Sequence, residues 1–182
     1  MPRQSNELNF EGQNIYVGID VHLKSWTVTI MTERLHHKTF TQPAKAETLL
    51  EYLHRHFPNG SYLSAYEAGF SGFWLHYKLT SMGINNIIVN PADVPTGQKE
   101  NVQKTDAVDS RKIARSLRGN ELTGIHVPGE YTLEARTLVR ARDAIVKDMT
   151  RMKQRLKSLL YFYGIPYPRS LKSRGRTGRA GS

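Results

Sequence analysis

Residues 15–33 read IYVGIDVHLKSWTVTIMTE, and this stretch decides the fold. Val, Ile, Thr, Trp and Tyr dominate it, as they do in strands. Residues 22–25 supply a short turn between two extended runs, and residues 34–43 (RLHHKTFTQP) supply a third run. The second and third runs can close a hairpin around Thr32–Arg34. The sequence therefore predicts an antiparallel three-strand meander at the start of a sheet.

Helical and extended patterns alternate after the meander. The predicted elements are a helix over 44–57 opened by Pro43, a strand over 61–68, a helix over 69–83 capped by Gly83, and a strand over 84–90. This order implies parallel strands joined by helical crossovers. We expect an α/β fold, a mixed sheet flanked by helices.

The remaining sequence predicts a loop, two helices and a tail. Residues 92–104 are polar, residues 105–120 form a helix, and a long helix runs from about 131 to 163. Apolar residues recur at heptad spacing along that helix and form a seam, which indicates a coiled coil between two chains. The same pattern would arise if the helix packed its apolar face against the domain of its own chain. The seam residues expected to dimerise are Leu138, Ile145, Met149, Met152, Leu156 and Leu159. We divide the chain into a leader (1–13), a catalytic domain (14–128), a basic coiled-coil helix (129–165) and a disordered Arg/Gly/Ser tail (166–182).

Charge is distributed unevenly. Residues 1–130 hold 13 basic and 13 acidic residues, whereas residues 131–182 carry the whole net charge of +10. This asymmetry favours a polyanionic partner such as nucleic acid over a membrane, since no apolar run is long enough to span one. The chain has no cysteine, which excludes disulfides and thiolate metal sites and favours a cytoplasmic protein. The basic residues expected to bind nucleic acid are Lys104, Arg111, Lys147, Arg151, Lys153, Arg155 and Lys157.

Four acids occupy positions suited to metal chemistry. Asp20 ends the first strand and Glu67 ends the fourth, and the carboxyl ends of parallel strands form the ligand crevice of an open α/β sheet. Asp106 and Asp109 share one face of a helix for which Thr105 is the expected N-cap. The positive end of the helix dipole favours their ionised, metal-binding form. Taken singly, these acids have other interpretations. Asp20 could be a turn residue and Glu67 a surface carboxylate at a strand end, and Asp106 and Asp109 could simply stabilise the positive end of the helix dipole.

Together these acids predict a site for hard divalent cations, Mg²⁺ or Mn²⁺. Two such ions, about 4 Å apart, could stabilise the attacking and leaving oxygens of phosphoryl transfer. His22 could approach this site, although an ordinary strand-end histidine is the better interpretation. Trp26, Phe73 and Trp74 could stack bases, but core packing explains them better.

Four segments resemble a known family, the DEDD-type insertion-sequence transposases. The segments are YVGIDVHLKSWTV (16–28), YEAGFSGFWL (66–75), VNPADV (89–94) and KTDAVDSRKIA (104–114). The resemblance implies an RNase H-like (RuvC-like) domain with Asp20, Glu67, Asp106 and Asp109 as its catalytic, metal-binding acids. It also implies DNA as substrate, a bacterial or archaeal nucleoid-associated protein and, for some members, a guide (bridge) RNA. The heptad seam of the long helix predicts a homodimer or higher oligomer.

The resemblance has one departure. Family members continue into a second domain with a serine proposed to attack DNA, and residues up to Ser182 do not match that domain. A stand-alone junction-resolving nuclease and a non-catalytic nucleic-acid-binding or dimerisation fragment remain as alternatives.

Overall fold

The computed structural model describes residues 8–95 and 105–167, and the chain divides into two compact units after Val127. The first unit contains, in order, β1 (Asn14–Val21), β2 (Ser25–Thr32), β3 (His36–Pro43), α1 (Ala46–His56), β4 (Ser61–Glu67), α2 (Trp74–Ser81), β5 (Asn85–Val89), the 3₁₀ helix η1 (Pro91–Asp93) and α3 (Asp106–Arg118). The second unit contains α4 (Glu130–Phe162). The predicted order of strands and helices is confirmed.

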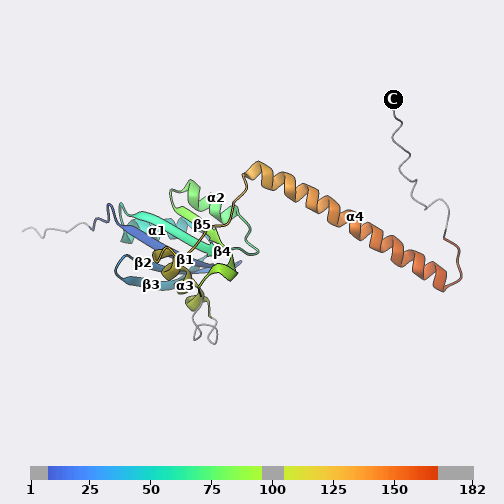
Figure 1. Ribbon diagram of the computed structural model, residues 1–182, viewed down its shortest axis with the longest axis horizontal. Helices are drawn as coiled ribbons and strands as arrows, with labels where there is room; N and C mark the ends of the chain where they lie inside the picture. Colours follow the sequence, from blue (N-terminus) through green and yellow to red (C-terminus); the bar gives the residue numbers. More distant parts are fainter. Residues whose placement is uncertain (1–7, 96–104, 168–182) are drawn as a thin grey trace, which may run out of the picture. The chain divides into compact units, whose positions relative to one another are not determined.

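The five strands form one sheet in the order β3-β2-β1-β4-β5 (Figure 1). β1, β2 and β3 pair antiparallel, whereas β4 is parallel to β1 and β5 is parallel to β4. A meander followed by parallel strands on the far side of β1 is the arrangement of an RNase H-like sheet. It places the carboxyl ends of β1, β4 and β5 along the same edge.

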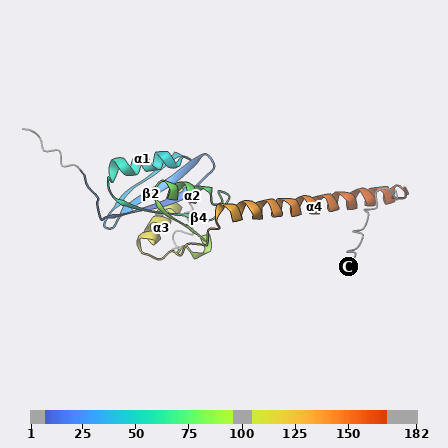
Figure 2. The ribbon, with the colours of Figure 1, turned by 90° about the horizontal axis from the view of Figure 1, so that it is seen from above.

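The two faces of the sheet carry different helices, with α1 and α2 on one face and α3 on the other (Figure 2). The larger core lies under α1 and α2, where Leu49, Leu53, Leu75 and Leu79 cover Ile15, Val17, Ile19 and Trp26. A smaller cluster under α3 joins Ala65, Val89, Val94 and Ile113. Because side chains alternate between faces along a strand, residues 18 and 20 of β1 face α3.

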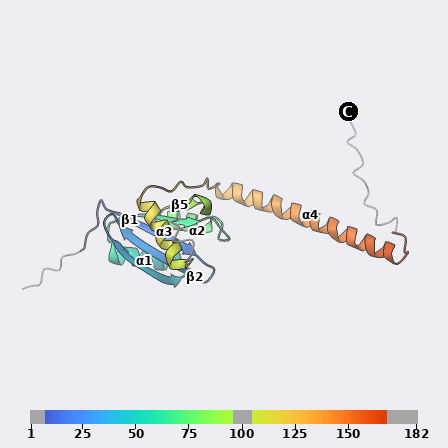
Figure 3. The ribbon, with the colours of Figure 1, turned by 60° about the horizontal axis from the view of Figure 1, so that its bottom comes forward.

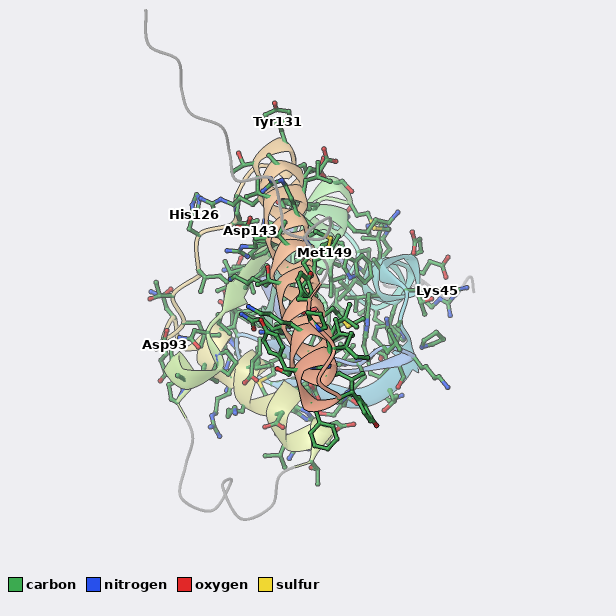
Figure 4. The ribbon with its side chains drawn as sticks, turned by 90° about the vertical axis from the view of Figure 1, so that its right-hand side faces the viewer. Lys45, Asp93, His126, Tyr131, Asp143 and Met149 are labelled. Atoms are coloured by element: carbon green, nitrogen blue, oxygen red, sulfur yellow. The ribbon has the colours of Figure 1, made fainter. Side chains whose placement is uncertain are left out.

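One long helix, α4, makes up most of the described part of the second unit. Its 33 residues include none that is buried, and the predicted seam residues Leu138, Ile145 and Met152 are exposed. Figure 4 shows the side chains of Tyr131, Asp143 and Met149 standing out from the helix. Among the described residues, no helix combines the length and apolarity needed to cross a bilayer.

Several details differ from the sequence prediction. Pro43 ends β3 and does not open α1, which begins at Ala46 after a non-helical Lys45. Residues 69–73 form turns, and α2 begins only at Trp74. Gly83 follows α2 with a φ of +83°, as a C-terminal cap requires. Residues 168–182 of the predicted tail, residues 1–7 of the predicted leader and Lys104 lie outside the described residues.

The two tryptophans, Trp26 and Trp74, differ in burial. Trp26 is fully buried in the larger core, as expected, whereas Trp74 is half exposed and packs its ring against that of Trp26, 6.3 Å between centroids. The expectation that Trp74 is a core residue is therefore wrong. The reason is that Leu75 and Leu79 form the face of α2 that packs on the sheet, and Trp74 lies about 100° around the helix from Leu75.

Candidate active site

Asp20 and Glu67 lie at one edge of the sheet. β1 and β4 are parallel neighbours, and the last paired residues, Ile19 and Tyr66, directly precede the two acids. Neighbouring strands are about 5 Å apart, so the two backbone positions are adjacent. Asp20 follows Gly18 by two residues and Glu67 follows Ala65 by two, so both project toward the α3 face.

Close packing of α3 on β1 brings the helix acids to this edge (Figure 3). Gly18 lies directly against the backbone of Ser110 and Ala114, and a Cβ at residue 18 would overlap the Ser110 carbonyl oxygen. The buried hydroxyls of Thr29 and Ser110 are hydrogen-bonded at 2.9 Å, which fixes the helix against β2. Thr105 caps α3, as predicted, by accepting a hydrogen bond from the Val108 amide at 3.3 Å.

His22 joins the strand acid to the first helix acid. Its Nε2 lies 3.1 Å from Asp20 Oδ2 and 3.3 Å from Asp106 Oδ2. The pKa of Asp20 is raised above its usual value, mainly because the carboxyl group is partly buried. The neighbouring His22 lowers this pKa, whereas the negative charges of Asp106 and Asp109 raise it. The charge of Asp20, and after it that of Asp106, raises the pKa of His22. The ligand atoms of Asp20, His22 and Asp106 all lie within 4.8 Å of one another, close enough to share one metal ion.

Lys112 joins the other two acids. Its Nζ lies 3.4 Å from Asp109 Oδ1 and 3.6 Å from Glu67 Oε1. Lys112 is only 8% exposed, so its charge is held at the base of the acidic cluster. The four predicted acids are thus linked in two pairs, Asp20 with Asp106 through His22 and Glu67 with Asp109 through Lys112.

Two residues of this arrangement are additions to the predicted site. The sequence favours an ordinary strand-end role for His22, whereas the structure places its ring against Asp20 and Asp106. Lys112 follows Asp109 by three residues, the same helical spacing that grouped Asp106 with Asp109, and that spacing could have identified it. Of the predicted nucleic-acid-binding residues, Arg111 is exposed on α3, whereas the five from Lys147 to Lys157 are exposed on α4, in the second unit.

The sequence of this chain is similar to those of known transposases. A family model described as "Transposase", of the DEDD type and named after IS110, matches residues 17–165. Among curated proteins, y4rJ of Sinorhizobium fredii, named as a transposase, is 32% identical over 129 residues. The transposase of insertion sequence element IS1533 from Leptospira borgpetersenii is 29% identical over 160 residues. The alignments cover 68% and 81% of this chain but only 32% and 44% of those proteins.

Similarity extends to solved structures. The RuvC structure of Thermus thermophilus aligns with a TM-score of 0.43 and 11% identity, over 61% of this chain and 99% of that one.

Proposed function

Since this chain belongs to the IS110-type family of DEDD transposases, we propose that it carries the metal-dependent strand-cutting site of an insertion-sequence transposase. The observation that supports this proposal is the meeting of four carboxylates at one sheet edge, with Asp20 and Asp106 sharing His22, and Glu67 and Asp109 sharing Lys112. Such a cluster is costly to hold together without cations, because like charges at close range oppose ionisation.

The donor atoms near Asp20 fit a hard divalent cation, Mg²⁺ or Mn²⁺. Carboxylate oxygens are the ligands such ions prefer, and the partly exposed pair Asp20 and Asp106 leaves room for water and phosphate. A bound ion would stabilise the charge that develops on the scissile phosphate and its leaving oxygen. Asp20 and Asp106 would hold it, with His22 Nε2 as a neighbouring nitrogen donor.

DNA is the proposed substrate, and the basic side chains of α4 would bind its phosphates. Arg151, Lys153, Arg155 and Lys157 are exposed on α4, within residues 131–182, which carry the chain's net charge of +10. A guide RNA would be a second polyanion for the same residues. Phosphate contacts of this kind position a duplex without reading its sequence.

Self-association through α4 belongs to the same proposal, with a second copy of this chain as the partner. A 33-residue helix is about 50 Å long. Its apolar seam at heptad spacing is exposed, and two copies would bury each other's seams. Because the chain spans 32% and 44% of the two transposases compared above, complete strand transfer is proposed only for a longer protein.

A nicking assay tests the proposed function. The chain is incubated with supercoiled plasmid and with a branched DNA, in Mg²⁺, Mn²⁺ or EDTA. We expect metal-dependent cutting that Asp20→Asn and Asp106→Asn abolish. Glu51→Gln is the control, since Glu51 is an exposed acid of α1 on the opposite face of the sheet. Intact DNA binding without cutting in either metal would contradict the proposal in favour of a non-catalytic binding fragment.

A further inference from the structure

Lys112 is a buried cation within the acidic site. Its side chain is 9% exposed, compared with 21% for Asp109 and 31% for Glu67, the two acids that its ammonium contacts. A charge at this depth is costly unless it is paired, and removing one partner of such a group leaves the other uncompensated. The ammonium is therefore part of the charge balance of the site.

The backbone fixes the place of this ammonium. Asp106, Asp109 and Lys112 follow one another at intervals of three and form a stripe along α3. The helix rests on Gly18 without an intervening side chain, and the Thr29–Ser110 hydrogen bond holds the turn between Asp109 and Lys112. Lys112 reaches the site from a rigid helix and not from a loop.

The site consequently has two unlike halves. In the half formed by Asp20 and Asp106, the bridging group is His22, whose side chain is 48% exposed and open to solvent. In the half formed by Glu67 and Asp109, the bridging group is the buried Lys112. A second divalent ion in that half would meet a fixed positive charge at contact distance and would have to displace a buried side chain.

We infer that Lys112 is the resident cation of the Glu67–Asp109 half, so that the protein binds one divalent ion, at Asp20 and Asp106, when metal alone is supplied. The inference rests on the proposed function, because it assigns roles within the same site. The sequence alone predicts two ions, and the buried charge of Lys112 is the physical reason for expecting one. Lys112 is thereby a positioning residue, since it acts by keeping Glu67 and Asp109 in place.

Counting bound ions tests this inference. The full chain is titrated with Mn²⁺ alone, and free Mn²⁺ is measured by electron paramagnetic resonance. We expect one bound ion in the parent and one in Lys112→Arg, which keeps the charge. In Lys112→Met, which keeps an unbranched side chain one atom shorter and removes the charge, we expect two.

A second pair of variants applies even if Lys112→Met does not fold, as judged by circular dichroism. Asp20→Asn should weaken Mn²⁺ binding by at least about tenfold, since losing a group that only supports a metal ligand already costs that much. Glu67→Gln should leave Mn²⁺ affinity nearly unchanged, because Lys112 and not the metal balances Glu67.

The outcomes separate the two proposals. Two ions in the parent, one ion in a folded Lys112→Met, or equal losses in Glu67→Gln and Asp20→Asn would each overturn the inference and leave the proposed function standing. Failure of the parent to bind Mn²⁺ would overturn the proposed metal site and, with it, the inference.

Discussion

Replacing Gly18 with alanine tests whether close packing of α3 on β1 assembles the acidic site. The added Cβ would lie inside 3.0 Å of both the Ser110 carbonyl oxygen and the Ala114 amide nitrogen, where ordinary contacts begin at 3.4 Å. Both obstacles are backbone atoms, so no side chain can rotate away. The helix must withdraw by roughly 1 Å, a shift of the size that can cost an active site about a hundredfold in rate.

The energetic cost has two parts. Overpacking of a tight contact costs about 1–3 kcal/mol. Lengthening the buried Thr29–Ser110 hydrogen bond, now 2.9 Å, adds about 0.5–1.5 kcal/mol. The sum of about 2–4 kcal/mol corresponds to a fall in Tm on the order of 10 °C for a domain of this size.

Thermal unfolding with and without Mn²⁺ measures both effects. We expect Gly18→Ala to lower the Tm and to lose most of the Mn²⁺-induced stabilisation, because Asp106 moves away from Asp20. Gly69→Ala is the matched control, since among the described residues a Cβ there would meet only the Glu67 carbonyl oxygen, at 3.9 Å. If Gly18→Ala matched Gly69→Ala in Tm and in its response to Mn²⁺, α3 would not depend on this contact and the reasoning would be refuted.

Three further predictions concern pH, assembly and binding. Folding raises the pKa of His22, so protonated His22 stabilises the fold below about pH 6.5, and this stabilisation is lost as the pH rises through the pKa of the folded state. Folding also raises the pKa of Asp20, so ionisation of Asp20 likewise lowers the stability as the pH rises above about 3.8. The Tm of the metal-free parent should therefore fall more steeply between pH 6 and 8 than that of His22→Gln, and parallel profiles would contradict this. Ile145→Asp with Leu156→Asp should yield monomers by light scattering while the sheet domain keeps its own unfolding transition, whereas a monomeric parent would show that α4 does not dimerise. DNA affinity should weaken with salt at a slope of about −0.9 per phosphate contact on duplex DNA, and the slope should become shallower when four basic residues are replaced by glutamine; an unchanged slope would show that they serve only solubility or assembly. These residues are Arg151, Lys153, Arg155 and Lys157.

The sequence by itself determined the order of elements and the candidate acids. The enrichment of residues 15–43 in Val, Ile, Thr, Trp and Tyr predicts the three strands of the meander, because β-branched and aromatic side chains favour strands. The spacing of Asp106 and Asp109 after Thr105 identifies a capped helix with acids on one face, since residues three apart are neighbours on a helix. These are local rules, and each is satisfied within a few residues of chain. The same rules place Asp20 and Glu67 at the ends of their strands.

Only the tertiary structure decided which charged groups meet. His22 lies between Asp20 and Asp106 because the N-terminal end of α3 lies beside the turn that follows β1. Neither the sequence of β1 and its turn nor that of α3 specifies this contact by itself. Lys112 is buried because α3 presses on a glycine of β1, so a residue that a helical pattern alone leaves on the surface lies at the base of the site. Periodicity fixes the face on which a side chain lies, whereas its depth and its partners depend on how closely two distant backbones approach. At Gly18 that separation is set by the absence of a single Cβ.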